Sequence, residues 1–184
     1  SDSPRLAVLA EGIDTTDLAA AMKAEVMELI RHHLRSEDLG WTDVLTSDLS
    51  FATDPRVADI YGVAPWDGVS SPPQLDPSER AGLLTRAGML YTPDGSTNPF
   101  RRGAFLRRNM LCGVAPPPPT DLPPDALEPP ETTPGTTTRE AFEALVADEP
   151  CAGCHLLFSD LGYGLEAYDG LGRFRSTERL VTTL

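Results

Sequence analysis

The residues of this chain with the most specific chemistry are Cys151, Cys154 and His155, which form a Cys-x-x-Cys-His sequence. Two thiols at this spacing lie on one helical turn, where each can form a thioether bond with one vinyl group of a haem. The histidine that follows then supplies an imidazole nitrogen as the proximal ligand of the iron. The pattern therefore predicts one covalently attached haem c, with His155 bound to its iron.

Other roles for the two cysteines agree less well with the rest of the sequence. A thioredoxin-like redox pair would follow a buried strand, whereas residues 140–146, just before the motif, have a helical pattern. A zinc site needs four ligands, and outside the motif the chain offers only Cys112 and the adjacent His32 and His33. A structural disulfide within the motif is a third alternative, but it explains neither the histidine nor the spacing.

The distal ligand of the iron must come from upstream of the motif, because no residue after His155 is methionine or histidine. Met110 is the first choice, since it precedes a proline-rich stretch that can return the haem segment to the helix carrying this methionine. A five-coordinate iron and a ligand from another chain are the alternatives. Further candidates, each more typical of a core or surface residue, are Met22, Met27, Met89, His32 and His33.

The residues after the motif have the composition of a haem pocket wall. Aromatic, aliphatic and glycine residues recur over residues 156–175, Tyr163 among them, and such residues pack closely on a porphyrin. Arg173 and Arg175 are candidates for pairing with the haem propionates, because arginine forms strong charge-assisted hydrogen bonds with carboxylates. The alternative is that both arginines pair with carboxylates of the protein surface.

Two arginine pairs, Arg101-Arg102 and Arg107-Arg108, form the only concentrated basic patch of the sequence. Such a patch is typical of a solvated face with weak ion pairs. It would also suit a clamp for propionates or a docking site for a partner. The remaining cysteine, Cys112, is expected to be a buried thiol, with pairing to another chain as the alternative.

Local signals place these residues on helices. Apolar residues recur at helical spacing in several segments, and residues that cap helices precede or follow them. The predicted helices cover Thr15–Arg35, a segment capped by Asp54 and closed by Gly62, a segment from Asn98 to Gly113, and a short helix with a capping box of Thr137 and Glu140.

The alternation typical of strands is scarce, so the sequence predicts a mainly α fold. We expect a helical domain over residues 1–114, followed by a proline-rich strap over residues 115–136 that is extended and semi-rigid. The strap leads to a short cytochrome c-like haem attachment segment over residues 137–184. This segment is expected to pack on the helical domain or on a neighbouring chain.

The charge of the chain restricts its partners. A formal net charge of -13 argues against nucleic acid and anionic membranes as partners. No apolar run approaches the ~20 residues needed to span a bilayer. The first residues lack the features of a signal peptide, yet haem c is normally attached outside the cytoplasm. We therefore expect a periplasmic or extracellular location, with a leader that was removed or lies upstream.

Several longer stretches resemble a known family in their order and spacing. They include Leu45–Phe51, Arg80–Thr85, Asn98–Gly103, Asn109–Cys112, the Cys151–His155 motif and Gly162–Arg175. Together they resemble the planctomycete-type cytochrome c multidomain proteins of Planctomycetes and myxobacteria, whose domains are largely of unknown function. The resemblance implies covalent haem and an extracytoplasmic location. The family often has a methionine three residues after the motif histidine, where this chain has Phe158.

The sequence thus predicts a c-type cytochrome module that transfers electrons within a larger extracytoplasmic assembly. Its partners would be a redox protein or neighbouring subunits, and the chain is expected to be a piece of a larger protein because family members extend further. A haem enzyme of the peroxidase or oxygenase type, with an open distal site, is one alternative. An assembly module in which haem has a mainly structural role is the other.

Overall fold

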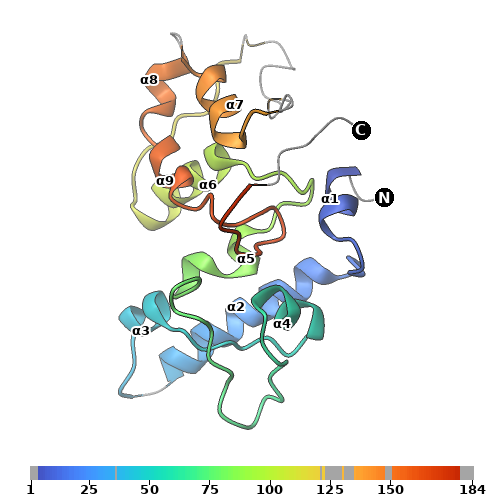
Figure 1. Ribbon diagram of the computed structural model, residues 1–184. Helices are drawn as coiled ribbons and strands as arrows, with labels where there is room; N and C mark the ends of the chain where they lie inside the picture. The colour runs from blue at the N-terminus through green and yellow to red at the C-terminus, as the bar shows by residue number, and fades with distance from the viewer. Residues whose placement is uncertain are drawn as a thin grey trace. The chain divides into compact units, whose positions relative to one another are not determined.

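The structure is a computed structural model that describes residues 4–35, 37–120, 122, 130, 135–147 and 151–178 (Figure 1). Most of the proline-rich strap predicted over residues 115–136 lies outside the described residues, and so does Pro150 before the motif. The described residues form helices, turns and isolated β-bridges but no strand, which confirms the prediction of a mainly helical fold.

The chain forms two compact units. The first unit runs up to Ser96 and includes Tyr168–Arg175, and the second runs from Thr97 to Ala167 and continues at Ser176. These boundaries differ from the division predicted from the sequence, which placed residues 1–114 in one domain. The reason is that the helix starting at Pro99 packs against the segment after the haem motif, and so belongs with that segment.

Helix α2 is the centre of the first unit. It begins at Leu18, three residues later than predicted, and its buried face contributes Leu18, Met22 and Leu29 to the core. It contacts α3, α4 and α5. The helices of this unit are α1 (Pro4–Leu9), α2 (Leu18–Arg35), α3 (Trp41–Thr46), α4 (Pro55–Tyr61), the 3-10 helix η1 (Leu83–Thr85) and α5 (Ala87–Leu90).

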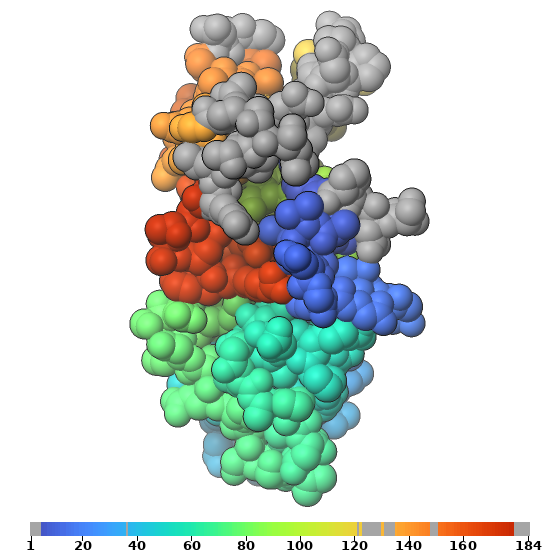
Figure 2. All heavy atoms as spheres, turned by 45° about the vertical axis from the view of Figure 1, so that its right-hand side comes forward, coloured from blue at the N-terminus to red at the C-terminus, as the bar shows by residue number. Residues whose placement is uncertain are grey.

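Helix α4 begins and ends as its sequence predicts. The Asp54 side chain accepts a hydrogen bond from the Arg56 amide at 2.9 Å, and Pro55 occupies the first helical position. Gly62 ends the helix in the left-handed conformation, with φ of 70°. Figure 2 shows α4 and the loop after it on the surface of this unit.

Arg86, directly after the family-like stretch Arg80–Thr85, is the centre of a buried polar network in the first unit. The Arg86 guanidinium is fully buried and forms an ion pair with Glu25 of α2, with an N–O distance of 3.2 Å. The Tyr61 hydroxyl donates to the same carboxylate at 3.0 Å. Burial raises the pKa of Glu25, although Arg86 opposes this shift. Arg86 also donates to the backbone carbonyls of Ser47, Leu49 and Gly82.

Arg80 fixes the returning segment Tyr168–Arg175 within the first unit. Its guanidinium lies 4.6 Å from the centre of the Tyr61 ring and 5.1 Å from that of the Tyr168 ring. It also donates to the Gly172 carbonyl at 2.6 Å. In the family-like stretches, Arg80 and Tyr168 therefore have a structural role, because their contact packs two distant segments of this unit together.

The second unit holds the Cys151–His155 motif, which the sequence predicts to bind haem. Its helices are α6 (Pro99–Phe105), the π-helical turn η2 (Leu106–Met110), α7 (Thr138–Leu145), α8 (Cys151–His155) and α9 (Ser159–Tyr163). Asn98 caps α6 by accepting from the Arg101 amide at 2.9 Å, and Thr137 and Glu140 form the predicted capping box of α7. Among the helices that the structure describes, none combines the length and the hydrophobicity that crossing a bilayer requires.

Helices α6 and α9 approach each other so closely that glycine is required on both sides. A Cβ atom added at Gly103 would lie 2.0 Å from the Phe158 carbonyl oxygen, and one added at Gly162 would lie 1.8 Å from that of Pro99. Both distances are well below van der Waals contact. The close packing fixes α9, and the turn before it, on the surface of α6.

Candidate haem site

The haem motif forms a single helical turn, α8, with both thiols free. Cys154 is exposed and Cys151 is half-buried, and neither forms a disulfide. Helix α7 precedes the motif, as the argument against a thioredoxin-like pair requires. Within the described ranges, no three His, Cys, Asp or Glu side chains gather into a metal-ion site.

The imidazole of His155 lies among aromatic rings. The ring centres of Phe100 and Phe158 are 4.0 Å and 5.0 Å from its own, and Phe142 packs edge-on against Phe100 at 4.7 Å. The Nδ1 atom is buried and has no hydrogen-bond partner. Burial lowers the pKa of His155, so the neutral form, which is the form that binds iron, predominates at neutral pH.

These residues fit a covalent haem c. Two free thiols stand on the same helical turn as a neutral imidazole, and the apolar rings beside that imidazole suit contact with a porphyrin. The Nδ1 atom of the same imidazole is buried without a hydrogen-bond partner, so the described protein groups leave this nitrogen unsatisfied.

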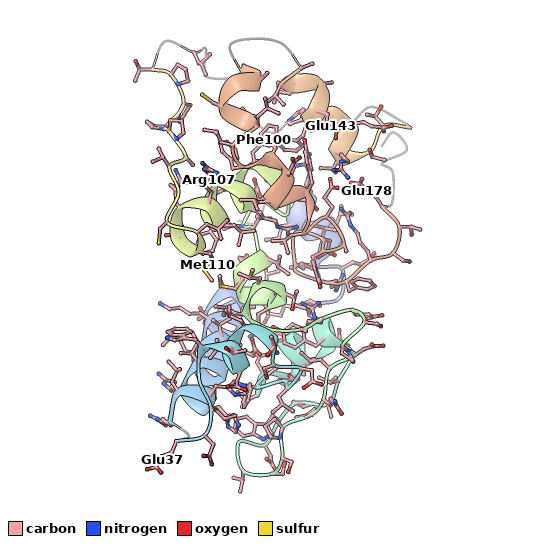
Figure 3. All side chains as sticks on the ribbon, turned by 90° about the vertical axis from the view of Figure 1, so that its left-hand side faces the viewer. Glu37, Phe100, Arg107, Met110, Glu143 and Glu178 are labelled. Carbon is pink, nitrogen blue, oxygen red and sulfur yellow. The ribbon has the colours of Figure 1, made fainter. Side chains whose placement is uncertain are left out.

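One face of α6 and η2 positions the haem segment. Phe100, Gly103 and Arg107 recur at helical spacing on this face, and each contacts the segment that starts at His155. Phe100 touches the His155 ring, Gly103 admits the Phe158 carbonyl, and Arg107 donates to the Leu157 carbonyl at 2.9 Å. Figure 3 labels Phe100 and Arg107 on this helical segment.

Tyr163, a predicted wall residue, is buried on α9 in the same unit. The Arg139 guanidinium of α7 lies 4.5 Å from the centre of its ring. The hydroxyl oxygen of Tyr163 is buried without a hydrogen-bond partner, and burial raises the pKa of Tyr163 to about 12. The hydroxyl is therefore protonated at neutral pH and can act as a donor.

The comparisons with known proteins identify a family. A family model described as PSCyt3, a protein of unknown function (DUF1588), matches residues 80–178, which is more than half of the chain. The chain belongs to the PSCyt3 family. This agrees with the resemblance to planctomycete cytochrome c-associated proteins and specifies no activity. No curated protein and no solved structure matches the chain significantly.

The PSCyt3 region contains the haem motif and residues of both compact units. Its first residue, Arg80, belongs to the first unit, as does the stretch Tyr168–Arg175. The predicted propionate ligands Arg173 and Arg175 therefore lie in a different unit from His155. Arg173 donates to the Leu9 carbonyl at 2.7 Å. Pairing of these arginines with propionates stays a prediction.

The predicted distal ligand, Met110, lies at the end of η2, ten residues beyond the ring that touches His155. A helical segment of this length spans about 15 Å, and Figure 3 shows Met110 at the opposite end of the segment from Phe100. The structure thus does not bring Met110 to His155, and its role as distal ligand stays a prediction. The other candidates, from Met22 to Met89, belong to the first unit.

The arginine pairs of this region form a solvated face only in part, since Arg101 and Arg108 are exposed, and the alternative of a propionate clamp or docking site stays a prediction. Arg102 is buried and donates to the Leu165 carbonyl at 3.0 Å. Arg107 donates to two backbone carbonyls, whereas Arg108 is exposed. Cys112 is also exposed, contrary to the expected buried thiol. Cys112 lies in the turn that follows η2, with a positive φ of 52°.

Sequence reasoning missed Phe100 as a residue of the site, and it named Arg107 only as part of a basic patch that could clamp propionates or dock a partner. Their contacts with His155 and Leu157 join segments about fifty residues apart, which no local pattern reveals. In the structure Gly113 leaves room for the Arg107 side chain, since a Cβ atom there would lie 2.9 Å from Cγ of Arg107.

Proposed function

We propose that this chain is a c-type cytochrome module. It carries one haem bound through Cys151 and Cys154, with His155 as the proximal ligand, and it transfers single electrons. The observation that supports this most is α8 itself, which presents two free thiols and a neutral imidazole on one helical turn. The PSCyt3 match agrees with a cytochrome-related role.

Each residue of the site has a distinct task in this proposal. The two thiols anchor the porphyrin covalently, and the neutral imidazole donates its lone pair to the metal. Phe100 and Phe158 hold the imidazole plane and exclude water from one side of it. A bound haem would supply a one-electron couple, whose potential the burial and hydrogen bonds of the site set.

The proposed setting is a larger extracytoplasmic redox assembly. Covalent haem c is normally assembled outside the cytoplasm, and this supports a periplasmic or extracellular location. The formal net charge of -13 favours a redox partner, or a neighbouring subunit, with a basic contact surface.

The experiment is to produce the chain with the haem c assembly machinery and to record absorption spectra of the oxidised and reduced protein. The proposal predicts a Soret band that survives denaturation, because the haem is covalently bound. The double variant Cys151→Ser/Cys154→Ser should lose this band, whereas the matched control Cys112→Ser should keep it. Absence of the band from the wild-type protein would overturn the proposal.

Carbon monoxide distinguishes electron transfer from a haem enzyme. A low-spin spectrum that carbon monoxide does not change indicates a strong distal ligand and supports electron transfer. A high-spin spectrum that shifts with carbon monoxide indicates an open iron, and it would replace electron transfer by the peroxidase or oxygenase alternative.

A further inference from the structure

The side chain of Arg107 connects three parts of the second unit. Its Nε atom donates to the Val114 carbonyl at 2.7 Å, and its Nη1 atom donates to the Leu157 carbonyl at 2.9 Å. Its own carbonyl accepts from the Gly113 amide at 2.8 Å. One residue of η2 thus holds both the chain that follows η2 and the turn directly after the haem motif.

The turn that Arg107 holds determines the direction of His155. Leu157 is the second residue after His155, and its amide donates back to the Cys154 carbonyl at 3.2 Å. With the Leu157 carbonyl bound by Arg107, both polar backbone groups of this residue are occupied. The Phe158 amide donates to the His155 carbonyl at 3.1 Å, which closes the same turn.

A hydrogen bond from a charged guanidinium is stronger than one between neutral groups, and it depends on the planar geometry of arginine. The remaining restraint on the imidazole is ring packing, since Nδ1 has no hydrogen-bond partner. The direction of the imidazole is therefore set by this ring packing together with the backbone turn that carries His155.

We propose that Arg107 is a positioning residue for the proximal ligand. By holding the Leu157 carbonyl, it orients the His155 imidazole against Phe100, and so it tunes the iron site that the proposed function requires. This inference rests on the proposed function, because an iron must be present to be tuned. Arg107 itself touches neither thiol nor imidazole in any contact that the structure gives.

The test compares Arg107→Ala and Arg107→Lys with the neighbouring control Arg108→Ala. Arg108 carries the same charge, and its Nη1 atom makes a long contact, 3.5 Å from the Ala115 carbonyl. In haem-loaded protein we expect both Arg107 variants to shift the midpoint potential and the spectroscopic signature of the proximal histidine. Arg108→Ala should match the wild type. Lysine keeps the charge but cannot reproduce the two-donor fork, so it should restore little.

A second measurement uses the haem-free chain. Amide hydrogen exchange over residues 156–158 should become at least tenfold faster in the Arg107 variants, while exchange in α2 stays unchanged. Faster exchange together with a shifted potential supports the inference. An unchanged potential in a haem-loaded Arg107→Lys protein would overturn it, even if exchange is faster.

The same series separates this inference from the proposed function. A wild-type protein without haem would overturn both, whereas a normally loaded wild type with indistinguishable Arg107 variants would overturn only the role of Arg107. If Arg107→Ala does not fold, Arg107→Lys and its potential decide the matter.

Discussion

The first unit buries charged side chains, and the clearest case is the ion pair of Arg86 and Glu25. Both side chains are almost completely buried. Removing one member of such a pair leaves an uncompensated charge, and this usually costs more than the pair contributes.

We expect Arg86→Met to lower the free energy of unfolding by about 3–5 kcal/mol. The substitution leaves the buried Glu25 carboxylate, and three backbone carbonyls, without a guanidinium. Urea unfolding followed by circular dichroism measures the change. The double variant Glu25→Leu/Arg86→Met should lose less than Arg86→Met alone, and an equal or larger loss would contradict this explanation.

His33 makes the stability of the first unit depend on pH. Its side chain is buried, and neither ring nitrogen has a hydrogen-bond partner. The titratable or charged side chains near it include His32, Asp43 and Arg86. Burial, and next the proximity of His32, lower the pKa of His33 below its ordinary value of 6.5. The unfolded chain therefore takes up a proton near that pH, while the folded chain does so only at lower pH.

The free energy of unfolding should consequently fall as the pH drops below 6.5, by up to about 1.4 kcal/mol for each pH unit. The loss stops at the lower pKa of the folded state. His33→Leu should remove this part of the pH dependence, and His32→Leu, at an exposed neighbour, should retain it. Equal slopes between pH 7 and 5 for the wild type and His33→Leu would contradict the prediction.

At the scale of elements, two glycines set the distance between α6 and α9. We expect Gly162→Ala to destabilise the second unit by about 1–3 kcal/mol, since its Cβ would overlap the Pro99 carbonyl. Gly164→Ala is the matched control, because its nearest neighbour would be at an ordinary 3.5 Å. Thermal melts measure both, and a similar loss for the two variants would show that the close approach is not the cause.

Helix boundaries were predictable where the signal is local. The caps at Asp54, Asn98 and Thr137 lie within three residues of the amides they bind, so the sequence contains the complete interaction. The π-helical turn η2 and the close approach at Gly103 were not predictable. Both depend on the segment that packs against α6, and the sequence around α6 does not contain that segment.

The candidate site also combines a local signal with contacts made by tertiary packing. The motif at Cys151–His155 can be recognised in the sequence because its chemistry requires a fixed spacing. Its surroundings are not, since Phe100 and Arg107 reach it only through tertiary packing. Arg173 belongs to the first unit and donates to the Leu9 carbonyl, a contact that the composition near the motif does not reveal, and its pairing with a propionate stays a prediction.

At the scale of the whole molecule, the chain passes between its two units three times, after Ser96, Ala167 and Arg175. The PSCyt3 region starts inside the first unit and leaves out α2. We expect a polypeptide of residues 80–178 alone to leave the segments 80–90 and 168–175 unprotected in amide hydrogen exchange. Adding residues 1–79 as a separate chain should restore protection. Full protection without them would contradict this prediction.

The buried partner of Arg86 lies on a helix outside the PSCyt3 region, and this has an evolutionary consequence. The region that the family model matches is shorter than the set of residues that pack into one compact unit with it. A recombination event that moved residues 80–178 into another gene would transfer a buried cation without its carboxylate. Selection should therefore keep α2 and the family region together in one gene, with no new junction tolerated between them.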